Sequence, residues 1–526
     1  MKMKNTKTAD DVERNISLSK NVKKKSDSIP EFLARNRYIL LTVLLFLMVF
    51  AVKVFFALQT PYFANEESYL HLRYAKYISE YGPFSTDHLT YDGRRIPFLS
   101  IYDSILASFD RLFDINIFAK ILNELISAGF IILVYLISKQ ISKNEKASFI
   151  AALSSSLIPF FTKNTFNSAS PEVLELFLIM ILLLLFLKIR QNKKLSSLYV
   201  FVLVLASSIS PMIFIFTISL VVFYIISSAY NITLEKYEKE LLLFSLFVSI
   251  IIELLFLRET LIQSGFSIIW GNIPTDLFKQ IYPELSLAHT AFFLGIVTVI
   301  IAFRTTYVNL VRKNNPSFFI IFSIAFTTVL LLWLKILTFD YGILIISIIL
   351  PIITGYFFAD VEEYLHITKI SNKTNLIIFS IVGIIIITNI YPTITSIIDS
   401  KPVVDKYDIT ALEWLKDNAN DREVVFSVPT YGNIITYFAD KKVVANSEYL
   451  GIKNINAIFR DFSLITTSTL KTNVIGLLNK YNVTYIVLNK ELDPKSFDNN
   501  MFNDKCFEES YMNRKIKILK LKCRLE

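Results

Sequence analysis

The chain has 526 residues, of which 53% are hydrophobic and only 19% are charged, and its mean hydropathy is +0.49. The apolar residues gather in repeated continuous runs that are long enough to cross a hydrocarbon core of about 30 Å. Such runs are satisfied in lipid as helices, whereas a transmembrane β-barrel would show short alternating segments. The composition therefore predicts a multi-pass helical membrane protein.

The first 37 residues are polar and rich in lysine, a composition that does not build a packed core. We expect them to form a basic tail on the cytosolic side. The apolar run that follows is too long, and too poorly followed by small residues, to be a cleaved signal peptide. It is interpreted as the first membrane span.

Apolar runs along residues 38–390 predict a transmembrane domain of roughly eleven spans. The fifth and sixth runs are short and are separated only by residues 208–211, so they form either a shallow hairpin or one broken helix. The parity of the count depends on that choice. The runs lie at 38–58, 117–137, 147–161, 173–187, 198–208, 212–226, 241–257, 291–302, 318–336, 343–358 and 376–390.

Lysine and arginine in the short loops predict the orientation, because these residues are enriched on the cytosolic side. Under the count above, the basic tail and all the basic loops fall on one side, which leaves the loop at 59–115 and everything after Ile390 external. The net charge of +9 is mostly explained by these anchors, so no nucleic-acid partner is expected. The basic loops lie at 143–146, 188–194, 304–313 and 369–373.

Residues 391–526 change in character and predict a small extracytoplasmic α/β domain. Helix-like and strand-like segments alternate along it. The run at 515–521 alternates basic and apolar residues, as an edge strand does. The other expected elements are helices at 410–418 and 434–438 and strands at 423–428 and 483–488.

Both cysteines of the chain, Cys506 and Cys523, lie in this domain. On the external side of a membrane they could pair, but the sequence does not show that their Cβ atoms meet. A disulfide and a reduced pair are both left open.

The first external loop, at residues 59–115, sets acidic, basic and aromatic side chains directly beyond the first span. Glu67 and His71 are four residues apart and Tyr74 follows at seven, so a helix beginning here places all three on one face. A carboxylate pair such as Glu66 and Glu67 can hold a hard divalent cation, which would neutralise a phosphate leaving group. The alternative is an interfacial amphipathic helix whose charges are merely solvated.

A second acidic position opens on the same predicted face. Glu172 directly precedes, and Glu175 enters, a strongly apolar helix, where acidic groups are costly unless they have a partner or a ligand. Glu172 is either a metal ligand or a first-turn charge that interacts favourably with the helix dipole.

These two motifs resemble a known family, the catalytic subunit of oligosaccharyltransferase. Residues 67–78, ESYLHLRYAKYI, are similar to its first external loop, where an acidic residue opens the pattern Asp-x-Tyr-x-(His or Asn)-x-Arg-x-Ala-x-Tyr. Residues 170–177, SPEVLELF, are similar to its second acidic motif, which ends in Glu a few residues before a Phe. The resemblance implies the GT-C superfamily of polytopic glycosyltransferases, with an external C-terminal domain.

The C-terminal domain resembles the family's stretch around Trp-Trp-Asp-Tyr-Gly, but only in part. Tyr431 and Gly432 match its Tyr and Gly and are expected on the acceptor side. Val428, Pro429 and Thr430 stand where the family has Trp-Trp-Asp, the tripeptide that reads the hydroxyl residue of the Asn-x-Ser/Thr acceptor. The resemblance therefore implies a changed acceptor.

The resemblance implies transfer of a sugar or oligosaccharide from a polyprenyl-phosphate or polyprenyl-diphosphate donor to a protein or glycolipid acceptor on the external face. Glu67 would be a metal ligand or the base that acts on the acceptor, with Glu66 beside it. Glu172 would be the second ligand of a divalent metal, Mg²⁺ or Mn²⁺. The expected donor-phosphate ligands are Arg73, Arg95 and Arg258.

Two alternatives stay open. One is a true oligosaccharyltransferase for protein N-glycosylation. The other is a non-catalytic lipid-handling or transport protein on the same scaffold, although no internal repeat of the transporter kind is evident. The ionisable residues Glu124, Glu253 and Lys335 within the apolar runs could serve a transport path, or an interhelical pair could account for them.

Overall fold

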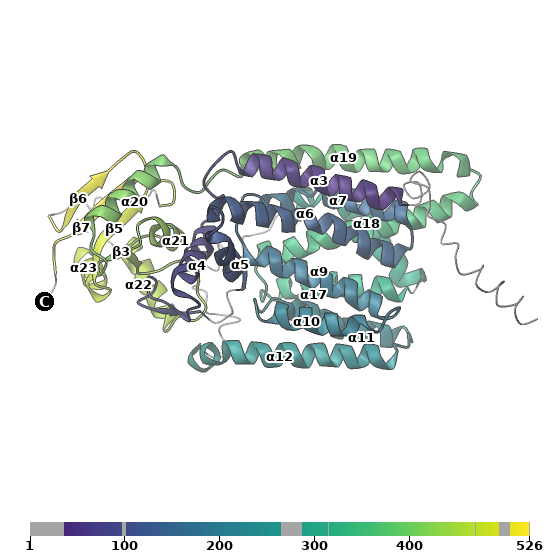
Figure 1. Ribbon diagram of the computed structural model, residues 1–526, viewed down its shortest axis with the longest axis horizontal. Coiled ribbons are helices and arrows are strands. Elements are labelled where there is room, and N and C mark those ends of the chain that lie inside the picture. The colour runs from purple at the N-terminus through teal and green to yellow at the C-terminus, as the bar shows by residue number, and fades with distance from the viewer. Residues whose placement is uncertain are drawn as a thin grey trace, which may run out of the picture.

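The computed structural model describes residues 36–96, 101–264, 287–313, 315–468, 470–493 and 505–524. The expected basic tail lies almost wholly outside these ranges. The described chain forms a bundle of apolar helices and a C-terminal α/β domain, and Figure 1 shows two helices of the first external loop between them, α4 (Glu67–Tyr81) and α5 (Ile101–Asp110).

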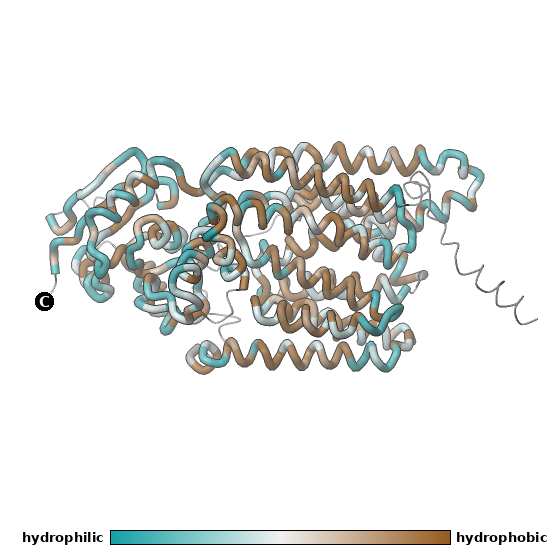
Figure 2. The backbone as a smooth tube through the Cα atoms, viewed as in Figure 1, coloured by the Kyte–Doolittle hydropathy of each residue, from teal (hydrophilic) through white to brown (hydrophobic). Residues whose placement is uncertain are grey.

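The apolar runs form the helix bundle. Figure 2 shows hydrophobic residues along the bundle helices and hydrophilic residues at their ends and over the C-terminal domain. Among the described residues, six helices are long and apolar enough to cross a membrane: α3 (Arg37–Ala57), α6 (Ile115–Ser142), α12 (Lys236–Ser264), α17 (Pro316–Trp333), α18 (Phe339–Ile367) and α19 (Thr374–Asp399). The other helices of the bundle are α7 (Glu145–Ser155), α8 (Pro159–Thr165), α9 (Pro171–Ile189), α10 (Leu195–Ser207), α11 (Ile213–Ala229), α15 (Leu287–Leu294) and α16 (Ile296–Val308). The multi-pass helical class is confirmed, while the count of about eleven spans stays a prediction.

Two of the expected runs are divided between helices, for local reasons. Pro159 is the first residue of α8, and because its ring cannot continue a preceding helix, α7 ends before it. Gly295 has a φ of +87° and separates α15 from α16. The fifth and sixth runs are the separate helices α10 and α11, and both pack against α12.

A short hairpin follows α4 in the first external loop. Its strands β1 (Thr86–Asp87) and β2 (Arg94–Arg95) pair antiparallel. Because successive side chains of a strand point to opposite faces, Arg94 is buried, with its side chain 4% exposed, whereas the side chain of Arg95 is 52% exposed. The hairpin thus decides which of the two arginines faces the interior.

The carboxylate of Asp87 fastens this hairpin to α4. It accepts hydrogen bonds from the guanidinium of Arg73 at 2.8 and 2.6 Å, and from the hydroxyls of Tyr74 and Thr90 at 3.0 Å. Burial disfavours the charged carboxylate, but the neighbouring Arg73 guanidinium outweighs it and lowers the pKa of Asp87 to about 2. Both terminal nitrogens of the Arg73 guanidinium are therefore bound to Asp87.

The C-terminal domain is built on one five-stranded sheet in the order β4-β3-β5-β7-β6. The strands are β3 (Val424–Phe426), β4 (Lys442–Val443), β5 (Val483–Asn489), β6 (Phe507–Met512) and β7 (Ile516–Leu521), and the helices are α20 (Lys406–Asn418), α21 (Pro429–Phe438), α22 (Ile455–Thr467) and α23 (Lys471–Lys480). The predicted α/β domain and its listed elements are confirmed.

The predicted edge position of the last strand is wrong. β7 lies between β5 and β6, and β6 is at the edge. Lysines of that run have acidic partners, and Lys515, at its start, pairs with Asp408 at 2.7 Å. Lys517 pairs with Glu509 at 3.7 Å, and Lys522, just beyond β7, pairs with Glu508 at 2.9 Å.

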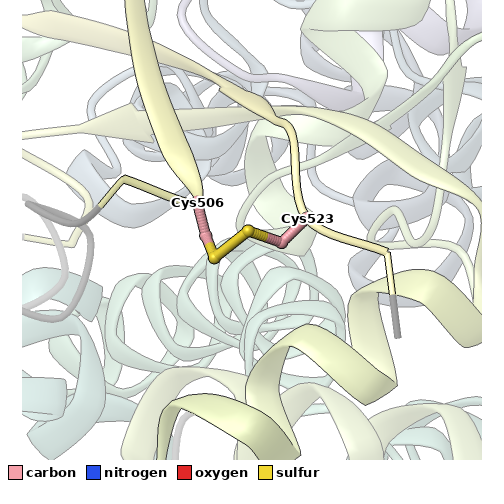
Figure 3. The surroundings of a disulfide bond; sticks show 2 residues. All are labelled: Cys506 and Cys523. Carbon is pink, nitrogen blue, oxygen red and sulfur yellow. A yellow bond between two sulfur atoms is a disulfide. The ribbon is translucent and has the colours of Figure 1, made fainter. Parts of the chain in front are cut away.

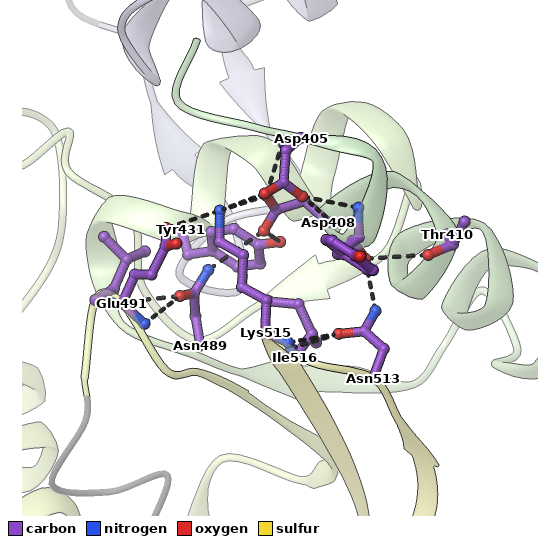
Figure 4. A network of polar contacts seen from close by, with 11 residues as sticks. Asp405, Asp408, Thr410, Tyr431, Asn489, Glu491, Asn513, Lys515 and Ile516 are labelled. Atoms are coloured by element: carbon purple, nitrogen blue, oxygen red, sulfur yellow. Dashed lines mark hydrogen bonds and ion pairs between the residues drawn. The ribbon is translucent and has the colours of Figure 1, made fainter. Parts of the chain in front are cut away.

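A buried polar network centres on Asp408 of α20 and joins four elements of this domain (Figure 4). The carboxylate of Asp408 accepts hydrogen bonds from the Tyr431 hydroxyl at 2.7 Å, the Lys515 ammonium at 2.7 Å and the Asn489 amide at 3.3 Å. These donors belong to α21, to the residue before β7 and to β5. Because every donor converges on one buried carboxylate, the network positions α20 and α21 on the sheet.

Cys506 and Cys523 form a disulfide that links the residue before β6 to the residue shortly after β7 (Figure 3). Their Cα atoms are 4.9 Å apart, within the range that a disulfide spans. Disulfides persist in oxidising compartments, so the bond agrees with the predicted external position of this domain.

The disulfide gives a direct test of topology, because the chain has no other cysteines. In intact cells, we expect a membrane-impermeant maleimide to label the protein only after treatment with a membrane-impermeant reductant. A gel shift after labelling measures the reaction. Labelling without reductant would contradict the disulfide, and labelling only after lysis would contradict the external position.

Replacement of Asp87 by Asn should destabilise the protein. The substitution leaves the buried charge of Arg73 without its partner, which typically costs about 3–5 kcal/mol. Thermal unfolding in detergent measures the effect, and Asp92→Asn, an exposed position in the turn of the same hairpin, is the matched control. Equal unfolding temperatures for the two variants would contradict the structural role of the Asp87–Arg73 pair.

Candidate active site

A cavity of about 230 Å³ lies where the helix bundle, the first external loop and the C-terminal domain meet. Its walls come from α4, α5, the start of α9, the α10–α11 turn and a loop of the C-terminal domain at 448–450. Charged side chains occupy part of the wall, and apolar side chains from α4, α5 and the α10–α11 turn occupy the rest. The ionisable and hydroxyl-bearing residues are Glu67, His71, Tyr74, Arg94, Tyr102, Asp103, Glu172, Ser210 and Glu448.

Glu67 and Glu172, the two acidic residues selected from the sequence, both line this cavity. Glu67 is the first residue of α4, and Glu172 lies in the first turn of α9, where the Ser170 side chain caps the helix by accepting from the Glu172 N–H at 3.2 Å. The starts of α4 and α9 are tied together, since the Ala169 N–H donates to the Ser68 hydroxyl oxygen at 2.7 Å. The two carboxylates therefore face one space from two joined helix ends.

His71 stands beside Glu67, one helical turn along α4. One ring nitrogen lies 2.8 Å from a carboxylate oxygen of Asp103, and the other lies 3.8 Å from Glu67. Burial by itself favours the neutral imidazole, but the Asp103 carboxylate outweighs it, with help from Glu67, and the pKa of His71 rises to about 10. The cavity thus contains a fixed positive charge next to Glu67.

Arg94 provides a second positive charge in the cavity. Its guanidinium donates to the hydroxyl of Tyr74 and pairs with the carboxylate of Glu448 at 3.3 Å. Glu448 belongs to the C-terminal domain, so that domain contributes a wall of the site.

Glu66, predicted to act beside Glu67, does not line the cavity. Its carboxylate accepts a hydrogen bond from Asn433 of α21, whose amide also donates to Ser447 at 2.9 Å. Burial raises the pKa of Glu66 to about 8. The structure therefore places Glu66 in the contact between the external loop and the C-terminal domain.

The predicted phosphate ligands do not gather at the cavity. Arg73 is bound to Asp87, and Arg95 forms a half-exposed ion pair with Glu259 near the end of α12. Arg258 is exposed on the same helix. The arginine that lines the cavity together with Glu67 and Glu172 is Arg94, which was not among the predicted ligands.

Tyr431 and Gly432, expected on the acceptor side, lie in the core of the C-terminal domain. Tyr431 is 1% exposed and donates to Asp408. A Cβ atom on Gly432 would lie 2.4 Å from the carbonyl oxygen of Ala445, so close backbone packing requires glycine there. Both residues have clear structural roles at these positions.

Sequence reasoning missed two cavity residues, Asp103 and Glu448. Asp103 is 32 residues beyond His71 and lies on another helix, so no helical period connects them. Glu448 is in a different domain. A carboxylate preceding an apolar segment in a catalytic loop was the only available signal for Asp103, and none existed for Glu448.

Glu67 and Glu172 give the cavity two carboxylates, and a divalent cation held by them would complete its coordination with substrate and water. Among the described residues, no group of three or more His, Cys, Asp or Glu side chains is arranged to hold a metal, and no described residue donates a hydrogen bond to the Glu172 carboxylate. Two carboxylates in one cavity disfavour each other's charged form, and a bound cation would stabilise both in that form. Mg²⁺ in particular is commonly bound by one or two carboxylates together with substrate phosphates and waters.

No protein-family model matches the sequence and no curated protein matches it, whereas solved structures match its fold. The oligosaccharyltransferase of Archaeoglobus fulgidus, in the apo form, aligns with a TM-score of 0.60 and 14% identity over 85% of this chain and 70% of that one. ArnT from Cupriavidus metallidurans, bound to undecaprenyl phosphate, aligns with a TM-score of 0.54 and 8% identity over 92% and 98% of the two chains. The mycobacterial arabinofuranosyltransferase AftD aligns with a TM-score of 0.50 and 11% identity over 91% of this chain and 41% of that one.

The Archaeoglobus enzyme has also been solved with zinc and sulfate, and with an inhibitory peptide and a dolichol phosphate. At these identities the likeness is one of fold. The expectation drawn from residues 67–78 and 170–177 is confirmed at that level: the chain has the GT-C fold of membrane glycosyltransferases, with an α/β domain at its C-terminal end.

Proposed function

We propose that the protein is a membrane glycosyltransferase that moves a sugar or oligosaccharide from a polyprenyl-phosphate or polyprenyl-diphosphate donor to an acceptor on the external face. The observation that carries the proposal is the pairing of Glu67 and Glu172 in one cavity with Arg94 and an apolar wall. A lipid-linked donor has a charged phosphate next to an apolar prenyl chain, and such a cavity offers a partner to each. The neighbours of known structure that contain dolichol phosphate or undecaprenyl phosphate support this donor class.

Glu67 and Glu172 would hold the divalent cation. When bound, this cation supplies positive charge to the departing lipid phosphate. Glu67, whose side chain is 29% exposed, lies at the side of the pair that an acceptor reaches from the surface. His71 keeps its charge through Asp103 and offsets the negative charge of Glu67 when the site is empty. The rate enhancement would come from positioning and electrostatic stabilisation, which need few reacting side chains.

The external orientation follows from the basic loops and agrees with the disulfide of the C-terminal domain. The acceptor would be a protein or a glycolipid. Since Tyr431 and Gly432 are packed in the domain core and Val428, Pro429 and Thr430 replace the acceptor-reading tripeptide, no observation favours protein N-glycosylation over other acceptors.

Glu67→Gln and Glu172→Gln should each lower sugar transfer by roughly 100-fold or more, because each removes one of the two cavity carboxylates. The measurement is release or transfer of sugar from a labelled pool of polyprenyl-linked donors, with and without a chelator. Glu80→Gln, exposed on the same helix α4, is the matched control and should retain activity. Undiminished turnover in Glu67→Gln would refute the site, and no turnover of the unaltered protein with any donor would favour a lipid-handling protein.

Glu66→Gln should change the pH dependence of stability. The pKa of Glu66 rises from 4.5 to about 8 on folding, so the folded state retains a proton that the unfolded state has lost. The contribution of Glu66 to stability is therefore fully present below about pH 4.5 and is lost as the pH rises toward 8. Glutamine does not titrate, so the unfolding temperature of the unaltered protein should fall relative to that of the variant across this window. Parallel curves would show that Glu66 is not held as described.

A further inference from the structure

Arg94 is a buried cation whose hydrogen-bonding capacity is only partly used. Its guanidinium contacts one hydroxyl, that of Tyr74, and one carboxylate, that of Glu448. Its Nε atom is buried and has no hydrogen-bond partner among the described residues. A buried guanidinium normally has its donors satisfied, because an unpaired buried charge is costly. Arg94 therefore lines the cavity with a donor that no described residue uses.

The Arg94–Glu448 pair is unequal in its surroundings. The Arg94 side chain is 4% exposed, whereas that of Glu448 is 31% exposed. A partly exposed carboxylate returns to water at small free-energy cost, but the buried guanidinium of Arg94 still requires an anionic partner when Glu448 leaves. If another anion replaces Glu448, Arg94 therefore keeps an anionic partner, and Glu448 returns to water at small cost.

The backbone around Glu448 is held while its side chain is comparatively free. The Glu448 N–H donates to the Asn446 side chain at 3.1 Å, and the Arg95 N–H donates to the Gly451 carbonyl at 3.3 Å. Gly451 has a φ of +80°, and a Cβ atom there would lie 2.0 Å from the carbonyl oxygen of Arg95. This close approach fixes the 446–451 loop beside β2, so that only the Glu448 side chain has to rotate.

We propose that Arg94 binds the phosphate of the lipid-linked donor and that Glu448 occupies the position of that phosphate when the site is empty. The inference rests on the proposed function for the lipid part of the ligand. Arg94 is the guanidinium that shares the cavity with Glu67 and Glu172, and planar guanidinium groups match phosphate oxygens in bidentate geometry. Entry of the phosphate breaks the Arg94–Glu448 pair, so the C-terminal domain loses this ion pair with the external loop when donor binds.

The test is the binding of a polyprenyl phosphate to the full-length protein in nanodiscs. Arg94→Gln should weaken binding by roughly tenfold or more, because it removes a charge-assisted contact to the phosphate. Glu448→Gln should tighten binding several-fold, because it removes the competing carboxylate. Arg111→Gln, at an exposed position of the same external loop, is the matched control and should leave binding unchanged. Unchanged or weaker binding in Glu448→Gln, or unchanged binding in Arg94→Gln, would overturn the proposal.

The Glu448→Gln result keeps the test valid if Arg94→Gln fails to fold, since Glu448 is partly exposed. Inorganic phosphate as a competitor distinguishes the sources of the anion. Competition shows that the phosphate group alone is recognised, while Arg94-dependent lipid binding without competition assigns the site to the lipid phosphate. Either result supports the role of Arg94.

The inference and the proposed function can fail separately. Arg94-dependent binding of polyprenyl phosphate without sugar transfer from any donor would leave the inference standing and remove the transferase. Loss of transfer in Glu67→Gln together with unchanged lipid binding in Arg94→Gln would support the transferase and overturn the role of Arg94.

Discussion

The site depends on one buried ion pair in the helix bundle, between Lys53 of α3 and Glu124 of α6. Their charged atoms are 3.1 Å apart, and their side chains are 6% and 0% exposed. A single charge at such a position is expensive, so each residue requires the other, although the pair itself adds little net stability.

Glu124 also accepts from the Asn167 N–H at 2.8 Å, and this contact fixes the loop before α9. That loop in turn holds Ala64 and Ser68, and therefore the starts of both helices that carry Glu67 and Glu172. The pair also answers the question raised by Glu124 in an apolar run, because an interhelical partner accounts for it.

The C-terminal domain is part of the site rather than an appendage. Glu66 reaches Asn433 of that domain, while Glu448 reaches back to Arg94, so the two parts exchange polar contacts in both directions. Inside the domain, Asp408 and its donors hold α20 and α21 on the sheet and thereby fix the surface that meets α4. Asp103 pairs with His71 and Glu448 pairs with Arg94, so Glu67 and Glu172 leave the cavity with more carboxylates than cations. A divalent cation would offset that excess of negative charge.

Short-range sequence patterns correctly predict those structural features that are themselves local. The helix beginning at Glu67 was predicted from a spacing of four and seven residues, and it forms as expected because helix periodicity is a local property. The alternating lysines at 515–521 correctly predicted a strand but wrongly predicted its edge position. Alternation reports which face of a strand is polar, not which strands lie on either side, and here β6 lies beside the run and its Glu509 pairs with Lys517.

The sequence by itself determined the membrane class, the C-terminal α/β domain and the two acidic positions, because hydropathy and short-range spacing encode these features directly. Only the tertiary structure decided which charges work together. The sequence does not distinguish three arginines of the external loop. In the structure, Arg73 is bound to Asp87, Arg94 is buried by strand alternation, and Arg95 pairs with Glu259 at the surface. Likewise, Glu67 and Glu66 are adjacent, but one faces the cavity and the other faces Asn433. The physical reason is that side-chain partners such as Asp103 and Glu448 are brought in by packing between distant segments, which no local period records.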